Sequence, residues 1–144
     1  MPTDWLLRVS DGGNLRRSSK HGIWGIESTS PNNKYFIKHV KPGDRLWFVE
    51  CDTGGQSCAV ATYRSDNMRV AGLTMSNEDL GWNGEDADWD IEVHYTDLYD
   101  IKHIKLLTGI VGPATIRKYN EKCKVNLAVE YSNIERYCEV KREL

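Results

Sequence analysis

Residues 14–28 read NLRRSSKHGIWGIES, residues 40–50 read VKPGDRLWFVE and residues 54–63 read GGQSCAVATY. The first segment is a basic, hydroxyl-rich turn that leads to Trp24, and the other two are strands joined by a glycine-rich hairpin. Because Trp24 stands between Gly22 and Gly25, its ring has little steric cover and offers a flat face to a planar ligand. Tryptophans at such turns also pack across the mouth of a barrel, and that alternative stays open.

Around this centre the pattern predicts short strands and short helices. Asn14 can cap a helical turn through Ser19. Trp5 and Trp47 lie inside apolar strands and are predicted core residues. The elements expected up to Tyr63 are strands at 5–9 and 23–27, a helix at 34–40 ended by a Lys-Pro-Gly-Asp turn, a central strand at 45–50 and its partner at 57–63.

Downstream of Tyr63 the clearest signal is the alternation over residues 89–95, which predicts a half-buried strand. The other elements expected there are a long connection at 64–79, a turn at 97–100, strands at 101–107 and 125–131, an amphipathic helix at 114–123 and a helix from Ser132 to about Arg142. Short strands interleaved with short helices predict an α+β domain with the form of a small barrel.

Composition predicts one ordinary domain. The chain has 144 residues, 40% of them apolar, which suffices for a core that needs no stabilising cross-links. No apolar run reaches the ~20 residues of a membrane span, and no signal pattern opens the chain, so an intracellular protein with no membrane association is expected. The four cysteines lack zinc-knuckle spacing and are interpreted as free thiols, with a disulfide or a metal site as the alternatives.

Charge is distributed unevenly along the chain. The net charge is only −2, whereas cations cluster around residues 16–21 and 34–41, and residues 77–92 carry seven carboxylates with no lysine or arginine. A single nucleotide can be held at one face while long duplexes are repelled from the other. The histidines and glycines form no metal motif, deaminase motif or phosphate loop, so the sequence predicts no catalytic residues, no metal and no cofactor.

Two of the quoted segments resemble a known family. The run from Asn14 to Trp24 is similar to the YTH pattern of an asparagine, a basic-serine turn and Gly-Ile/Val-Trp, and GGQSCAVA resembles the YTH strand Gly-x-Phe-Cys-Gly-Val-Ala. Gly81-Trp82 followed by the strand at 89–93 resembles the second YTH cage tryptophan, and Lys-Pro-Gly-Asp at 41–44 resembles a turn of EVE domains. The resemblance covers about residues 4–107 of a single domain spanning 1–144, with 108–144 as a strand and helix extension.

The resemblance implies a PUA-like small mixed β-barrel flanked by short helices. It also implies an aromatic cage for a modified base, with Trp24 and Trp82 as facing walls across an open cleft. By position, the groups that would bond the base edge or the backbone are Asn14, Ser18 and Ser19, and those that would contact phosphate are Arg16, Arg17 and Lys20. Gly25-Ile26 and Ser57 depart from the residues that YTH domains carry at those places.

The function expected is therefore non-enzymatic binding of a modified nucleobase in single-stranded RNA or flipped from DNA. The alternative is a protein-interaction or structural module that uses the acidic loop 83–92 on a protein partner. A third possibility is a small-molecule or nucleotide-processing enzyme of the related ASCH type, whose Gly-x-Lys-x-x-Glu signature is not evident in the chain.

Overall fold

The computed structural model of the chain describes residues 2–9, 13–50, 56–70, 72–82, 89–100 and 116–118. Over these ranges it is an α+β fold built on one mixed sheet. The elements are β1 (Asp4–Val9), α1 (Gly13–Ser18), the 3₁₀ turn η1 (Ser19–His21), β2 (Ile23–Ile26), α2 (Pro31–His39), β3 (Arg45–Glu50), β4 (Gln56–Met68), β5 (Ile91–Asp100) and β6 (Ile116–Lys118).

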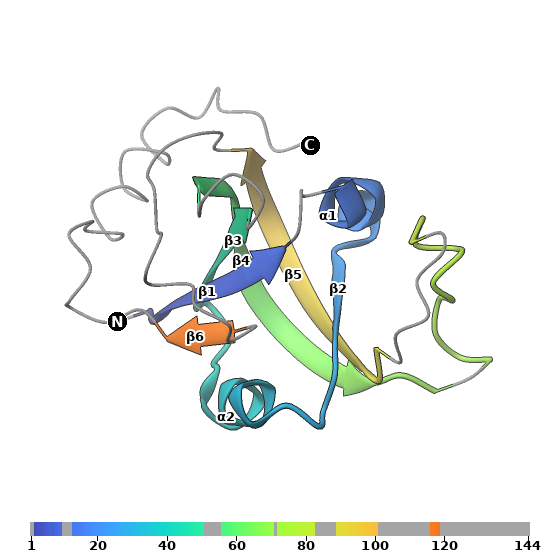
Figure 1. The fold of residues 1–144 in the computed structure, drawn as a ribbon, viewed down its shortest axis with the longest axis horizontal. Coiled ribbons are helices and arrows are strands. Elements are labelled where there is room, and N and C mark those ends of the chain that lie inside the picture. The colour runs from blue at the N-terminus through green and yellow to red at the C-terminus, as the bar shows by residue number, and fades with distance from the viewer. Residues whose placement is uncertain are drawn as a thin grey trace.

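The six strands lie in the order β2-β5-β4-β3-β1-β6. β1 and β3 run parallel, and the other neighbouring pairs are antiparallel. The long strands β4 and β5 curve strongly, and α1 and α2 lie at the two ends of β2 (Figure 1). A curved sheet agrees with the expected small barrel, although among the described strands no pairing joins the outer strands β2 and β6.

The core cluster includes one fully buried apolar side chain from each helix. Leu15 of α1 and Phe36 of α2 are both fully buried there. The predicted core positions Trp5 and Trp47 are confirmed, with exposed fractions of 1% and 0%. β3 is buried on both faces, as its nearly continuous apolar sequence predicts. The principal strand residues of the core cluster are Trp5, Leu7, Val9, Leu46, Phe48, Ala59, Ala61, Tyr63, Val93 and Tyr95.

The Lys-Pro-Gly-Asp turn joins the starts of β1 and β3. Gly43 has φ of 94°, a conformation that favours glycine. The buried carboxylate of Asp44 accepts hydrogen bonds from Thr3 N at 2.9 Å, Lys41 N at 3.0 Å and Trp5 Nε1 at 3.1 Å. Because one carboxylate serves three donors, this turn ties the buried Trp5 indole to the loop that precedes β3.

Asp44→Ala is expected to lower the free energy of unfolding by about 2 kcal/mol, because the Trp5 N–H loses its partner inside the core. Urea denaturation followed by far-UV circular dichroism measures the change. Glu78→Ala removes an exposed carboxylate and is the control, expected to change stability by at most about 0.5 kcal/mol. Equal stability of the two variants would show that the Asp44 carboxylate contributes nothing to the free energy of unfolding.

β4 and β5 are longer than the sequence pattern predicts. The predicted connection at 64–79 begins instead as strand, since β4 pairs with β5 as far as Met68↔Ile91. This half of β4 carries exposed polar residues, such as Arg64 and Asn67, and therefore lacks the apolar alternation from which a strand is predicted. The predicted turn at 97–100 was also wrong. β5 continues to Asp100, and Asp97 takes a φ of 53° where the β4–β5 register is irregular.

The predicted helix at 114–123 was wrong for the three residues that the structure describes there. Ile116–Lys118 form β6, which pairs antiparallel with β1 through Leu6↔Arg117. The pairing partner is more than 100 positions away in the sequence, so a local pattern gives no sign of it. The strands predicted at 101–107 and 125–131, the C-terminal helix and the rest of the 108–144 extension lie outside the described residues.

Candidate functional site

The basic turn is built by α1 and η1 and is held by its own serines. Ser18 is fully buried, and its hydroxyl lies 3.0 Å from the carbonyl oxygen of Asn14 and 3.2 Å from that of Ile23. Ser19 Oγ donates to the carbonyl oxygen of Arg16 at 2.8 Å. The resemblance implies that these hydroxyls bond either the base edge or the backbone. In this structure both hydroxyls contact the backbone. They hold the turn that carries the cations.

Trp24 and Trp82 contact each other directly. Their ring centroids lie 5.8 Å apart and the ring planes are inclined by 76°, an edge-to-face arrangement. Trp24 is partly buried, whereas Trp82 is only 2% exposed, and its Nε1 donates to the carbonyl oxygen of Asn14 at 3.0 Å. The expected pair of rings facing each other across an open cleft is therefore wrong for this structure. The hydrogen bond to α1 and the packing of Trp82 on Ile23 and Leu80 hold its indole inside.

Gly25 and Gly81 allow this packing. A Cβ at Gly25 would lie 2.7 Å from Cβ of Trp89 and 3.0 Å from Cζ3 of Trp82, so only glycine lets both indoles reach β2. Gly81 has φ of 81°, and a Cβ there would lie 2.9 Å from Cβ of Arg17. Glycines that suggest an uncovered tryptophan in the sequence thus serve close packing in the fold.

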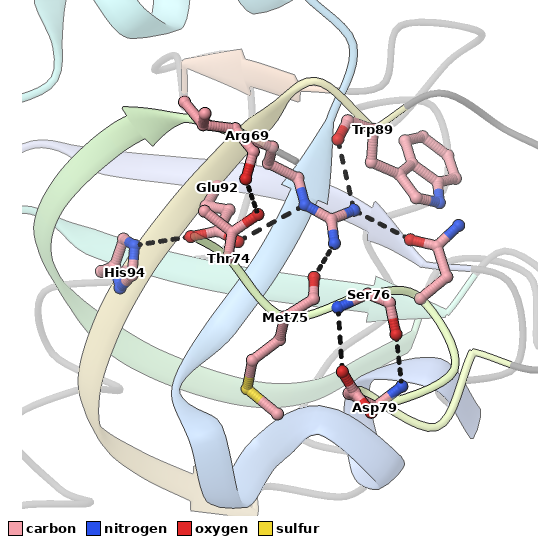
Figure 2. Close-up of polar contacts among 10 residues, drawn as sticks. Arg69, Thr74, Met75, Ser76, Asp79, Trp89, Glu92 and His94 are labelled. Carbon is pink, nitrogen blue, oxygen red and sulfur yellow. Dashed lines mark hydrogen bonds and ion pairs between the residues drawn. The ribbon is translucent and has the colours of Figure 1, made fainter. Parts of the chain in front are cut away.

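Arg69 forms hydrogen bonds with the segment that carries Trp82. The sequence pattern did not identify Arg69 as a residue of the site. Its guanidinium donates to Asn77 Oδ1 at 2.8 Å, to the carbonyl oxygen of Trp89 at 3.3 Å and to the carbonyl oxygen of Met75 (Figure 2). Ser76 and Asp79 exchange hydrogen bonds within the same segment (Figure 2). The available sequence signal was slight: Arg69 is the last arginine or lysine before the acidic run.

The same guanidinium forms an ion pair with a buried carboxylate. Arg69 Nε lies 3.4 Å from Oε2 of Glu92, whose side chain is 4% exposed, and His94 Nε2 lies 3.2 Å from Oε1 of Glu92 (Figure 2). The guanidinium carbon of Arg69 also lies 6.0 Å from the ring centroid of Trp82, within cation–π range. Arg69 therefore links the end of β4, the start of β5 and the indole of Trp82.

The cations of the basic turn have different surroundings. Arg16 is paired with Glu50 at 3.1 Å. Arg17 donates to Oδ1 of Asn14 at 2.6 Å and is exposed, and Lys20 is also exposed. The structure thus brings Asn14, Arg17, Trp24 and Trp82 together through direct contacts, while the phosphate-binding and base-binding roles of the predicted residues stay predictions.

Two carboxylates of the acidic run are bound within the fold. Asp90 accepts from the backbone N–H of Ser28 at 2.8 Å and from its hydroxyl, and the hydroxyl bond holds the pKa of Asp90 below its usual value. Glu92 is buried against Arg69. Both carboxylates therefore have bonding partners within the chain. The rest of the predicted acidic surface, residues 83–88, lies outside the described residues.

Two other kinds of feature are absent from the described ranges. No group of three or more His, Cys, Asp or Glu side chains there is arranged to hold a metal ion. None of the helices described is long and apolar enough to cross a membrane.

Comparison with known proteins identifies relatives by fold and not by sequence. No protein-family model matches the chain, and no curated protein matches it. The YTH domain of Pho92, solved in complex with m6A, superposes with a TM-score of 0.58 at 15% identity, covering 98% of this chain and 90% of that one. The YTH domain of Zygosaccharomyces rouxii MRB1, in complex with N6-methyladenosine RNA, gives a TM-score of 0.54 at 13% identity, with coverages of 98% and 90%.

A third solved structure also has a similar fold. A hypothetical protein from Leishmania major matches with a TM-score of 0.52 at 11% identity over 94% of each chain. The chain thus shares the fold of YTH domains, which confirms the predicted resemblance at the level of architecture. The wider PUA-like assignment and the EVE likeness stay predictions.

Proposed function

We propose that this chain is a non-enzymatic domain that binds a modified nucleobase in single-stranded RNA, or a base flipped out of DNA, on the indole of Trp24. The observation that carries the proposal is the position of Trp24: it is partly exposed, rests on Trp82, and adjoins the turn with the exposed cations Arg17 and Lys20. The YTH domains that share the fold were solved with N6-methyladenosine ligands, which supports this substrate class.

The buried position of Trp82 changes the form of the proposed site. A base cannot enter between two rings whose centroids lie 5.8 Å apart at 76°. We therefore assign stacking to the exposed part of Trp24 and treat Trp82 as the residue that fixes its orientation. Stacking on one aromatic ring contributes ~1–3 kcal/mol, and a buried methyl group adds ~1 kcal/mol. Only an unpaired base presents a free face for this contact.

The basic turn supplies the second half of the proposed site. Arg17 and Lys20 attract phosphate, with Arg16 adding charge beside its Glu50 partner. Asn14 connects the two halves, because its carbonyl oxygen accepts from Trp82 and its side-chain oxygen accepts from Arg17. Ser18 and Ser19 act as positioning residues that fix the turn.

The proposal is tested by titrating short single-stranded RNA and DNA oligonucleotides that carry one N6-methyladenine, and their unmodified counterparts, by fluorescence anisotropy. The wild type is expected to prefer the modified strand by about fivefold, which corresponds to ~1 kcal/mol for the methyl group. Trp24→Ala is expected to weaken binding of the modified strand by about tenfold or more, because the stacking face is lost.

Leu73→Ala is the matched control, since Leu73 is 83% exposed and has no assigned role in the site. It is expected to bind as the wild type does. Equal binding of both strands by wild type and Trp24→Ala, with thermal unfolding of the variants unchanged, would remove the proposal. If the wild type prefers another modified base in a wider panel and Trp24→Ala loses that preference, the site stands and only the modification changes.

A further inference from the structure

The outer face of α2 carries a second concentration of positive charge, apart from the basic turn. Its exposed residues, together with the lysine that follows the helix, are Lys34, Tyr35, Lys38, His39 and Lys41, and we call this set the α2 surface. No aspartate or glutamate occurs between Pro31 and Gly43. The inner face of α2 is buried through Asn33 and Phe36, so helical periodicity directs the cations outward.

The α2 surface also holds an exposed aromatic ring in a fixed place. Tyr35 is 49% exposed, and its ring lies against His39, with centroids 4.2 Å apart and planes inclined by 39°. The ring centroid of Tyr35 also lies 6.1 Å from that of Trp5, and Trp5 is itself fixed by the hydrogen bond to Asp44. The helix dipole accounts for cations in the last turn of α2, but it gives no reason for an anchored, half-exposed tyrosine among them.

A stacking ring framed by cations matches the chemistry of single-stranded nucleic acid. Proteins that bind such strands without reading sequence combine positive charge along the backbone with aromatic rings on which bases stack. An acidic peptide would also pair with the lysines, whereas every nucleotide of a nucleic acid strand supplies both a phosphate and a flat ring that can stack on Tyr35. The combination therefore favours a nucleic acid strand over a protein partner.

The place of the α2 surface in the fold brings it near the proposed base site. α1 and α2 lie at the two ends of β2, and Trp24 lies on β2 between them (Figure 1). A four-residue strand spans only about 13 Å, so one extended oligonucleotide can reach both ends. Along the chain, only β2 and the four residues that follow it separate the basic turn from α2.

We propose that the α2 surface binds the single-stranded nucleic acid that adjoins the recognised nucleotide. Lys34, Lys38 and Lys41 contact its phosphates, and a flanking base stacks on the Tyr35–His39 pair. The inference rests on the proposed function for its ligand class. It adds a second contact that is indifferent to base modification, so Trp24 sets the preference for the modified base and the α2 surface adds general, salt-dependent affinity.

The test measures the dissociation constant of an unmodified and a modified single-stranded oligonucleotide as a function of salt concentration. The variants are Lys34→Gln/Lys38→Gln, Tyr35→Ala and the control Arg64→Gln, which removes an exposed cation on β4. All four positions are exposed, so the variants are expected to keep the wild-type thermal unfolding temperature.

For the double lysine variant, the slope of log affinity against log salt concentration is expected to fall by about 1.4, or about 0.7 for each lost phosphate contact. Tyr35→Ala is expected to weaken binding about fivefold or more. In both variants the ratio between modified and unmodified strands stays as in the wild type. The Arg64→Gln control keeps the wild-type slope.

A wild-type slope and affinity in the double lysine variant would overturn the inference. Equal competition by an acidic peptide, lost with the same lysines, would also overturn it, because the occupant would then be a protein. Failure of the proposed function can be distinguished from failure of the inference about the α2 surface. A wild type that binds modified and unmodified strands equally, with a slope that falls in the double variant, leaves the α2 surface standing and removes the Trp24 assignment.

Discussion

Arg69→Met is expected to lower the free energy of unfolding by about 3–5 kcal/mol, because it leaves the buried carboxylate of Glu92 without its guanidinium partner. The variant also removes the donors to the carbonyl oxygen of Met75 and to Oδ1 of Asn77, which hold residues 72–82 against the sheet. Urea denaturation, monitored by tryptophan fluorescence, measures the loss.

Arg64→Met is the matched control, since Arg64 lies on β4 shortly before Arg69 and is exposed. The stability of this variant is expected to stay within about 0.5 kcal/mol of the wild type. Arg69→Met/Glu92→Leu is expected to recover part of the lost stability, because the unpaired buried charge is then absent. If Arg69→Met behaves like Arg64→Met, the ion pair has no net effect on folding.

Trp82→Ala is expected to cost about 3–5 kcal/mol of unfolding free energy, because a 2% exposed indole is replaced by a cavity. Unlike the loss at Arg69, this change also removes the ring against which Trp24 rests. Binding of the modified oligonucleotide is therefore expected to weaken together with stability. Denaturation and anisotropy titration, both below the unfolding temperature of the variant, separate the two effects.

Trp82→Phe separates packing from hydrogen bonding, since it keeps an aromatic ring but loses the N–H that donates to Asn14. Its expected cost is about 1–2 kcal/mol, with the preference for the modified base retained. A Trp82→Ala variant that is less stable but binds the oligonucleotide as tightly as the wild type would contradict the positioning role assigned to Trp82.

The sequence predicts well the elements whose signals are local. The apolar run of β3 indicates a strand buried on both faces, and the Lys-Pro-Gly-Asp turn indicates where α2 ends, although α2 begins at Pro31 and not at Lys34 as predicted. The core positions of Trp5 and Trp47 follow from the same strand patterns. In each case the residues that determine the structure lie within one element.

The parts that sequence reasoning missed depend on distant partners. Gly81-Trp82 has the local pattern of an exposed turn, but the indole is buried because the carbonyl of Asn14 and the guanidinium of Arg69 meet it in the fold. Arg69 has no local mark of burial, since its carboxylate partner belongs to another strand. The candidate site is therefore predictable as a set of neighbouring residues, and its internal geometry is not.

The position of β1 between β3 and β6 has a consequence for the order in which the sheet forms. β1 pairs with residues 45–50 on one side and with residues 116–118 on the other. The second pairing joins segments more than 100 positions apart, and such non-local contacts slow folding. A chain cleaved before residue 116 would leave one edge of β1 unpaired, and an unpaired strand edge promotes association with other chains.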